Sequence, residues 1–439
     1  MQFTKALQHT IVWKVINTVL TFCINLLLVR IMGGEYSGIF FYAIALYAFF
    51  TLVMSGSIES GITYFGSNNS LNIKSLSIFL IPWLIIQGGI SWLLLGIIDL
   101  GLNKQFAWFY IVANLVIVYF TALYYTQKRF ILINVIICVV NFFVMIFLLL
   151  IYLQPNFFAE NPSPLIPQSI GANAHKISLA ANTYFAGFVI QALLLLFIFF
   201  YKQDWKLLPV KFEPALIKKL FSYSMIAFIS NILFFLVTRL DYYFVQKYCD
   251  EVALSNYVQV SRMGQLLILL PTMMAAVIFP YSSEKGDDIE ANYLQKLQQL
   301  CRIISFLFIP VAIIIVATGF WIFPWLFGAA FNQMYVAFLW YLPGFYALSI
   351  VTLLAAYLAG KAMLTSNMIA TIISLVAVAA GDVFLIPIFG INAAAGVSSL
   401  AYIFGLVYLL WVYHNYLQTN ISIFFSFKKK DLNLLINIF

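Results

Sequence analysis

Residues 130–153 read FILINVIICVVNFFVMIFLLLIYL, a run of 24 residues without one charged side chain. As an α-helix, a run of this length rises about 36 Å at about 1.5 Å per residue, enough to cross a hydrocarbon core of about 30 Å. The run is continuously apolar, whereas strands of a membrane barrel alternate and are about ten residues long. We therefore predict a transmembrane helix here, because only helices and closed barrels satisfy every backbone hydrogen bond inside a bilayer.

The composition extends this prediction to the whole chain. Of its 439 residues, 64% are hydrophobic and 9% are charged, and the mean hydropathy is +0.99. A soluble protein has about 25% charged residues, and no water-soluble fold could bury this much apolar surface. The sequence therefore predicts an all-α integral membrane protein.

About twelve apolar runs are long enough to span. The first begins at His9, is too long for the apolar part of a signal peptide and has no cleavage site after it, so we interpret it as a span. The predicted spans are 9–32, 38–62, 73–98, 105–126, 130–153, 179–201, 220–246, 254–280, 302–326, 333–359, 367–388 and 391–416.

The basic residues fix the orientation of these spans. With the N-terminus inside, sixteen of the 23 Lys and Arg residues fall in inside segments, three fall outside and four lie within spans. Basic residues are concentrated in cytoplasmic loops of membrane proteins. We therefore predict that both termini are cytoplasmic. The net charge of +8 is then explained by these loops, and no nucleic-acid partner is expected.

The chain is predicted to consist of two six-helix lobes related by pseudo-two-fold symmetry. They are residues 1–201 and 220–416, joined by a lysine-rich cytoplasmic linker at 202–219 and followed by a basic cytoplasmic tail at 417–439. A weak internal repeat supports the two halves, because Glu35 and Glu251 coincide when their first hairpins are aligned. The proline-rich outer segment 154–178 is interpreted as a variable loop, with a lid over an outer opening as the alternative.

The sequence carries no enzyme signature. It contains no HExxH, GxSxG, P-loop or DxD motif, and its histidines His9, His175 and His414 lie at span ends or in a loop. The four cysteines are scattered without a CxxC pair, which argues against a disulfide framework or a zinc site. We therefore expect a transporter that uses no cofactor and no bound metal centre.

Seven ionisable residues lie inside predicted spans, where charges are costly and usually face a cavity or a partner. One hypothesis is a set of closed ion pairs, such as Arg262 with Asp382 or Lys14 with Glu59. The other is a hydrated cavity whose arginines hold an anionic group, since the guanidinium fork matches phosphate. The basic candidates for substrate binding are Arg239, Arg262, Lys14 and Arg30, and the acidic candidates for ion coupling are Asp241, Asp382 and Glu59.

Polar uncharged residues within the spans have two interpretations. Asn17, Asn25, Asn231 and Gln265 could meet sugar hydroxyls, but each is more often a helix–helix hydrogen bond.

Five stretches resemble the polysaccharide-transport flippases, the Wzx-type members of the multidrug/oligosaccharidyl-lipid/polysaccharide exporter superfamily. Leu28–Gly38 is similar to their first hairpin, and Leu240–Tyr243 to the end of their seventh span. Leu270-Pro271 and Phe279–Ser282 match their eighth span, and Leu385–Ala394 resembles a turn of theirs. The chain departs from this pattern at Asn392, where glycine is usual, and at Asp382, where asparagine is more common.

The resemblance implies a V-shaped protein of twelve helices with a central cationic cavity between two lobes. Such proteins flip an undecaprenyl-pyrophosphate-linked oligosaccharide, an O-antigen or capsule repeat unit, across the bacterial plasma membrane by alternating access. Coupling to H⁺ or Na⁺ is expected, through Asp241, Asp382 or Glu59. Membrane lipid, a polysaccharide polymerase and a chain-length regulator are the other partners that the resemblance implies.

Two further functions stay open. A cation-coupled drug exporter of the same superfamily would favour an acidic surplus in the spans, whereas here four bases face three acids. A membrane polysaccharide polymerase usually needs catalytic arginines in a large outer loop, and the segment 154–178 contains no arginine.

Overall fold

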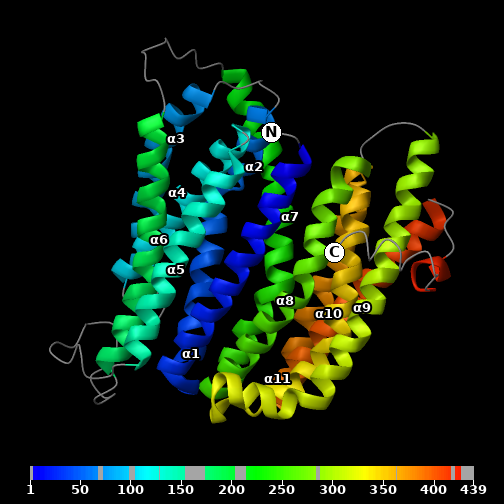
Figure 1. Ribbon diagram of the computed structural model, residues 1–439. Coiled ribbons are helices and arrows are strands. Elements are labelled where there is room, and N and C mark those ends of the chain that lie inside the picture. Colours follow the sequence, from blue (N-terminus) through cyan, green and yellow to red (C-terminus); the bar gives the residue numbers. More distant parts are fainter. Residues whose placement is uncertain are drawn as a thin grey trace. The chain divides into compact units, whose positions relative to one another are not determined.

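The structure is a computed structural model that describes residues 3–67, 73–97, 104–127, 129–153, 174–202, 214–282, 287–361, 363–416 and 421–426. Within these residues it is helical, as the composition predicts (Figure 1). Most of the predicted segments 154–178, 202–219 and 417–439 lie outside the described residues. The helices are α1 (Phe3–Ser55), α2 (Ile58–Ser67), α3 (Ile73–Ile97), α4 (Lys104–Thr126), α5 (Phe130–Leu153), α6 (Ala174–Lys202), α7 (Pro214–Tyr248), α8 (Glu251–Ser282), α9 (Asp287–Phe327), α10 (Met334–Gly360) and α11 (Leu364–Tyr416), with short 3₁₀ turns η2 (Ala329–Phe331) and η3 (Ile421–Phe424).

Nine helices of the described chain are long and apolar enough to cross a membrane. The chain is therefore a multi-pass membrane protein. Two of the nine have apolar stretches of 44 and 52 residues, Val12–Ser55 in α1 and Leu364–Asn415 in α11. At about 1.5 Å per residue each rises more than twice the thickness of a hydrocarbon core of about 30 Å. Each therefore has the length of two spans, as the sequence predicts for 9–62 and 367–416.

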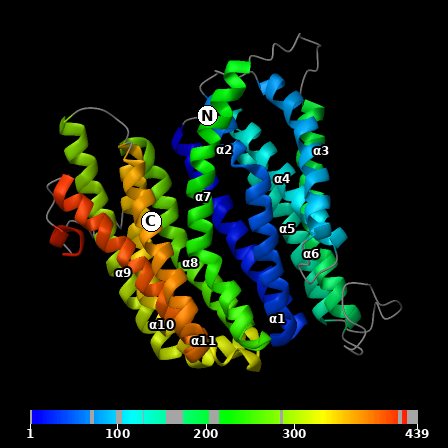
Figure 2. The ribbon, with the colours of Figure 1, turned by 180° about the vertical axis from the view of Figure 1, so that it is seen from behind.

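A glycine interrupts each of these long helices. Gly33 has φ 74° and Gly390 has φ 61°, in the left-handed region that side chains with a Cβ rarely adopt. The ribbon turns back at both points, so that each helix consists of two arms (Figures 1 and 2). These breaks fall where the sequence separates the first span from the second and the eleventh from the twelfth.

The second predicted span differs from the structure, because residues 38–62 are not one helix. The helix α1 ends at Ser55 and α2 begins at Ile58. Between them, Gly56 and Ser57 have φ of 53° and 51°, and two consecutive left-handed residues cannot continue a right-handed helix.

The chain divides into two compact units. Unit 1 consists of Met1–Gly33 and Phe40–Ile232, and unit 2 of Gly34–Ile39 and Leu233–Phe439. The division at Ile232 lies inside α7, later than the linker expected at 202–219. The first part of α7 lies against α2, since a Cβ on Gly61 would be 2.6 Å from the Ser224 hydroxyl.

Unit 2 includes a short piece of α1 because that piece packs on the start of α8. The Ser37 and Ser255 hydroxyls are 2.5 Å apart and hydrogen-bonded. A Cβ on Gly38 would lie 2.6 Å from the Glu251 carbonyl oxygen and 2.8 Å from the Ser255 amide nitrogen. The absence of a side chain at Gly38 therefore allows the two backbones to touch.

The predicted orientation can be tested with reporters. A reporter enzyme fused after residue 165 is expected to show activity characteristic of the outside, and one fused at residue 210 activity characteristic of the inside, because lysines surround the second position. Phosphatase and β-galactosidase fusions at both sites provide the measurement. The opposite pattern would overturn the assignment of both termini to the cytoplasm.

Candidate functional site

Two carboxylates lie inside unit 2 with no exposed surface. Asp241 of α7 and Asp382 of α11 are both 0% exposed. Both lie against the second arm of α11, since Asp241 accepts a hydrogen bond from Ser398 and a Cβ on Gly381, next to Asp382, would touch Val397. A buried carboxylate costs several kcal/mol unless it is paired or hydrogen-bonded, so the surroundings of the two groups distinguish their roles.

Asp241 is held by three donors. Its Oδ2 accepts hydrogen bonds from the Tyr257 hydroxyl and from the Ser398 hydroxyl at 3.2 Å. Its Oδ1 accepts the backbone N–H of Tyr242 at 2.8 Å. Donors from α7, α8 and α11 therefore converge on this carboxylate, and both of its oxygens have hydrogen-bond partners.

Asp382 has no such support. Neither of its carboxylate oxygens has a hydrogen-bond partner among the described residues. The arms of α11 are tightly packed here, since a Cβ on Gly381 would lie 2.5 Å from a methyl carbon of Val397. Buried polar groups in native proteins are nearly always hydrogen-bonded. Asp382 therefore differs from Asp241, because both of its oxygens are buried without a hydrogen-bond partner among the described residues.

Arg239 supplies a positive charge beside this pair. One of its terminal nitrogens, Nη1, donates to the Tyr242 hydroxyl and to the Ser261 hydroxyl, the latter at 3.2 Å. Its guanidinium also lies 4.8 Å from the centre of the Tyr242 ring, a cation–π distance. Arg239 and Asp241 thus bond to different partners, as expected for residues two apart on one helix.

Tyrosines surround the carboxylates on the side of α10. Tyr341 stacks on Tyr257 with ring centres 6.2 Å apart, and its hydroxyl lies 3.2 Å from that of Tyr402. We call Arg239, Asp241, Tyr257, Tyr341, Asp382, Ser398 and Tyr402 the carboxylate cluster. The cluster joins α7, α8, α10 and both arms of α11.

The structure brings together three of the seven ionisable residues that the sequence places within spans, namely Arg239, Asp241 and Asp382. The ion pair between Arg262 and Asp382, one of the two hypotheses from the sequence, is not formed, because neither oxygen of Asp382 has a hydrogen-bond partner in the described chain. Arg262 is partly exposed on α8 and has contacts of its own.

The remaining predicted basic residues belong to unit 1. Lys14 and Arg30 are both exposed on the first arm of α1. The role in substrate binding that the sequence suggests for them stays a prediction.

Glu59, the third acidic candidate, lies beside the break between α1 and α2. Its Oε2 is buried without a hydrogen-bond partner in the described residues. Nearby, the Tyr119 hydroxyl donates to the Ser55 carbonyl at 3.2 Å, and Gln87 donates to that hydroxyl at 2.8 Å. Unit 1 thus has its own buried acidic group next to a helix break.

Where the structure defines their contacts, the polar uncharged candidates form hydrogen bonds between helices. Asn141 donates to Asn17 at 2.7 Å, and Gln191 donates to Asn141 at 2.9 Å. Asn231 donates to the Ser57 hydroxyl at 3.0 Å. These contacts tie helices of unit 1 together and favour the structural interpretation of Asn17 and Asn231.

Sequence reasoning missed the hydroxyl partners of Asp241. Tyr257 and Ser398 are 141 positions apart in the chain and carry no charge, so neither stands out in an apolar sequence. The available signal was that Tyr257 belongs to the second hairpin of the internal repeat.

A family of polysaccharide biosynthesis proteins matches residues 170–336, which contain α6 to α9 and the Arg239, Asp241 and Tyr257 part of the cluster. A search of curated proteins finds no match.

Solved structures share the fold over nearly the whole chain. The lipid II flippase MurJ, in an inward closed conformation, superposes with a TM-score of 0.66 at 16% identity, covering 96% of this chain and 91% of MurJ. An inward-facing multidrug resistance MATE family transporter of the MOP superfamily superposes with a TM-score of 0.67 at 13% identity, covering 94% of this chain and 98% of that transporter. A MOP superfamily transporter from Pyrococcus furiosus superposes with a TM-score of 0.60 at 14% identity, covering 96% of each chain.

These comparisons agree with the resemblance found in the sequence. The structures that share the fold are transporters and flippases, and the sequence family concerns polysaccharide biosynthesis. At these identities the structures establish the fold alone, and the family match covers residues 170–336, less than half of the chain. The chain therefore has the fold of the lipid II flippase MurJ and of MATE transporters, and its residues 170–336 match a family of polysaccharide biosynthesis proteins.

Proposed function

We propose that the chain flips an undecaprenyl-pyrophosphate-linked oligosaccharide, an O-antigen or capsule repeat unit, from the inner to the outer leaflet of a bacterial plasma membrane. The observation that carries the proposal is the match of residues 170–336 to polysaccharide biosynthesis proteins within a flippase fold. A drug exporter would share the fold but would not be expected to match that family.

The proposed architecture has twelve spans in two six-helix lobes related by pseudo-two-fold symmetry, with both termini in the cytoplasm. The two double-length helices α1 and α11 supply four spans. The twelfth span is α8, which is 32 residues long but too polar to be among the nine apolar helices. Movement of one lobe against the other would give alternating access.

Arg239, Arg262, Lys14 and Arg30 are proposed to hold the pyrophosphate. Arginine presents planar paired donors that match phosphate oxygens. Arg239 supports this role, because its hydrogen bonds to Tyr242 and Ser261 go to neutral hydroxyls and not to a carboxylate.

Asp382, with Asp241 and Glu59, is proposed to couple transport to H⁺ or Na⁺. A charged carboxylate that is 0% exposed and has no described hydrogen-bond partner is energetically unfavourable. Binding a proton or a cation at Asp382 removes that free-energy cost. Helices α7, α8, α10 and α11 meet at the cluster, so occupancy of this carboxylate changes the relative stability of their arrangements.

The proposed product supplies two further partners. A lipid-linked repeat unit on the outer leaflet is the substrate that a polysaccharide polymerase and a chain-length regulator would act on. We propose that both work next to this protein.

Arg239→Ala and Arg262→Ala are each expected to abolish surface glycan while leaving the amount of membrane-inserted protein unchanged. Each variant removes a guanidinium, and losing a charged partner of a phosphate costs about 100-fold or more in rate. Complementation of a deletion strain, followed by glycan staining and immunoblotting, provides the measurement. Lys247→Ala, which removes an exposed charge at the end of α7, is the matched control and should display glycan normally.

Normal glycan display in both arginine variants would refute the proposed role of these residues. The same deletion strain separates the drug-exporter alternative. Loss of the protein should leave resistance to cationic dyes unchanged and should cause lipid-linked glycan to accumulate on the inner leaflet.

A further inference from the structure

The break between α1 and α2 lies inside a predicted span and is buried. Ser55 and Ser57 are 2% and 0% exposed. Gly56 and Ser57 both have positive φ, and Ser57 carries a Cβ, so this conformation is strained at Ser57. Strained backbone of this kind persists only where the surroundings hold it, and it is concentrated at functional sites and in segments that switch conformation.

Two backbone carbonyls, those of Met54 and Ser55, lose their helical partners at this break. In a continuous helix each would accept the N–H group four residues later. Here Gln87 of α3 donates to the Met54 carbonyl, and the Tyr119 hydroxyl of α4 donates to the Ser55 carbonyl at 3.2 Å. Inside a bilayer no water can replace a lost backbone partner. The two side chains therefore take the place of the lost amides.

Gln87 and Tyr119 also bond to each other. The Gln87 amide nitrogen donates to the Tyr119 hydroxyl at 2.8 Å, and that hydroxyl lies 3.0 Å from Gln87 Oε1, to which it can donate in place of Ser55. The pair would therefore stay hydrogen-bonded if it released the two carbonyls, which would recover the amides of Ile58 and Glu59. Each of these groups has a partner in both arrangements, so the broken and the continuous helix are close in free energy.

The first part of α7 holds the broken form from another side. Asn231 donates to the Ser57 hydroxyl at 3.0 Å. A change of Ser57 to the right-handed conformation turns its side chain, so the continuous helix would lose this bond. The same change would relieve the strain at Ser57, and the two effects oppose each other.

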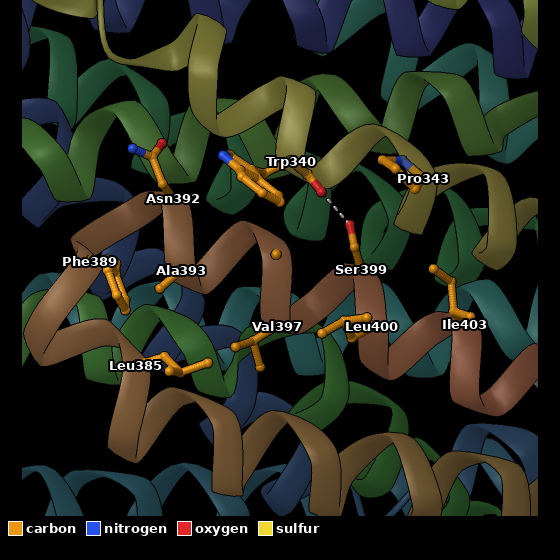
Figure 3. Close-up of a pocket in the computed structure, with 11 residues that line it drawn as sticks. Trp340, Pro343, Leu385, Phe389, Asn392, Ala393, Val397, Ser399, Leu400 and Ile403 are labelled. Atoms are coloured by element: carbon orange, nitrogen blue, oxygen red, sulfur yellow. Dashed lines mark hydrogen bonds between the residues drawn. The ribbon is translucent and has the colours of Figure 1, made fainter.

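The break in α11 is of a different kind. Leu385 before Gly390 and Val397 after it line one recess with α10 (Figure 3). The two arms of α11 thus lie side by side and cannot join into one straight helix. At Gly56 and Ser57, by contrast, a change in two residues would join α1 to α2.

We propose that residues 54–59 form a hinge at which the second span alternates between the broken form and a continuous helix. Gln87 and Tyr119 are positioning residues that hold the broken form. Glu59 follows the break directly, and its amide is one of the two that change partner, so the hinge determines where this carboxylate lies. The inference rests on the proposed function only for the use of Glu59 in ion coupling.

Spin-label distances across the hinge test the proposal. The labels are attached to Ala45→Cys in α1 and Tyr64→Cys in α2, in the full chain in nanodiscs with its four native cysteines replaced by serine. In a continuous helix the two Cα atoms would lie about 28 Å apart at about 1.5 Å per residue, and any break shortens this distance. We expect a shorter population and a second one near 28 Å. A shorter population alone, in this protein and in the hinge variants, would overturn the proposal.

Gly56→Ala is expected to raise the population near 28 Å about tenfold relative to the shorter one, because alanine disfavours the positive φ of the broken form. A Cβ on Gly56 meets no described atom within 4 Å, so the substitution acts through the backbone alone. Gly89→Ala adds a Cβ without a described neighbour inside α3 and should leave both populations unchanged. Equal populations in the two variants would contradict the hinge.

Gln87→Leu distinguishes a hinge from a fixed break. At a fixed break the Met54 carbonyl would lose its donor, and the unfolding temperature would fall without any gain of the longer distance. At a hinge the carbonyl recovers the Ile58 amide, so the population near 28 Å should rise about fivefold or more while the unfolding temperature changes little. The first result would refute the proposal.

These distances are measured on the purified protein and do not depend on its substrate. A wild-type protein that restores glycan display but shows no second distance would refute the hinge alone. A deletion strain that displays glycan normally would refute the proposed function, and two distance populations would still establish the hinge.

Discussion

Asp382→Asn is expected to abolish ion-driven translocation while leaving the protein as stable as the wild type or more stable. Asp382 is fully buried and no described residue bonds its oxygens. Removing a buried charge that lacks a partner is neutral or stabilising by up to about 3 kcal/mol. A cation can no longer bind the amide as it binds a carboxylate, so glycan display should fall by about 100-fold or more.

Asp241→Asn is the matched comparison and should change stability in the opposite direction. Its carboxylate accepts hydrogen bonds from Tyr257, Ser398 and the Tyr242 N–H. An amide replaces one acceptor oxygen by a donor, which leaves at least one of these groups without its partner at a cost of about 1–3 kcal/mol. Transport should be lost in this variant too.

Thermal unfolding of both purified variants, together with glycan display, provides the measurement. Asp382 is a functional carboxylate if its variant unfolds at or above the wild-type temperature and Asp241→Asn unfolds below it. A large loss of stability in Asp382→Asn would mean that Asp382 supports the fold, and the ion-coupling proposal would then lose its main residue.

Gly38→Val is expected to eliminate folded protein. A Cβ on Gly38 meets the Glu251 carbonyl oxygen at 2.6 Å, and the Ser255 amide nitrogen and Cα at 2.8 and 3.1 Å. All three are backbone atoms of α8, so no side-chain rotation relieves the overlap. Separating the two helices would also break the hydrogen bond between Ser37 and Ser255. A loss of more than about 4 kcal/mol follows, which is severe against the usual stability of a protein.

Gly89→Val provides the control within α3, where a Cβ would have no neighbour within 4 Å. Yield after detergent extraction and fluorescence-detected size-exclusion chromatography should show a monodisperse peak for Gly89→Val and none for Gly38→Val. Equal behaviour of the two variants would contradict the close contact of α1 with α8.

The sequence indicates that Gly38 belongs to a distinctive stretch, but it does not identify the helix on which Gly38 packs. It stands in the stretch Leu28–Gly38 that resembles the first hairpin of polysaccharide flippases. The turn is visible in the sequence through Gly33 and Gly34. The partner, the start of α8, is more than 200 residues away in the chain and could not be read from local pattern.

The membrane helices, the positions of most of their ends and the two long hairpins were determined by the sequence alone. Hydrocarbon requires about twenty apolar residues per crossing and internal hydrogen bonds throughout, so composition and run length suffice to identify a span. The break at Gly56 and Ser57 was not foreseen, because a serine with positive φ leaves no mark in a hydropathy pattern.

The tertiary structure decided which ionisable residues act together. Sequence analysis identified Asp241 and Asp382 as costly residues within spans and left a pair of Asp382 with Arg262 as one of two hypotheses. The structure brings the two carboxylates into one cluster and leaves the oxygens of Asp382 without a hydrogen-bond partner in the described chain. It also supplied Tyr257 and Ser398 as the hydroxyl partners of Asp241. The physical reason is that a bilayer dictates where a helix lies along the chain, whereas partners on different helices are fixed by how the helices pack, and packing depends on side chains far apart in sequence.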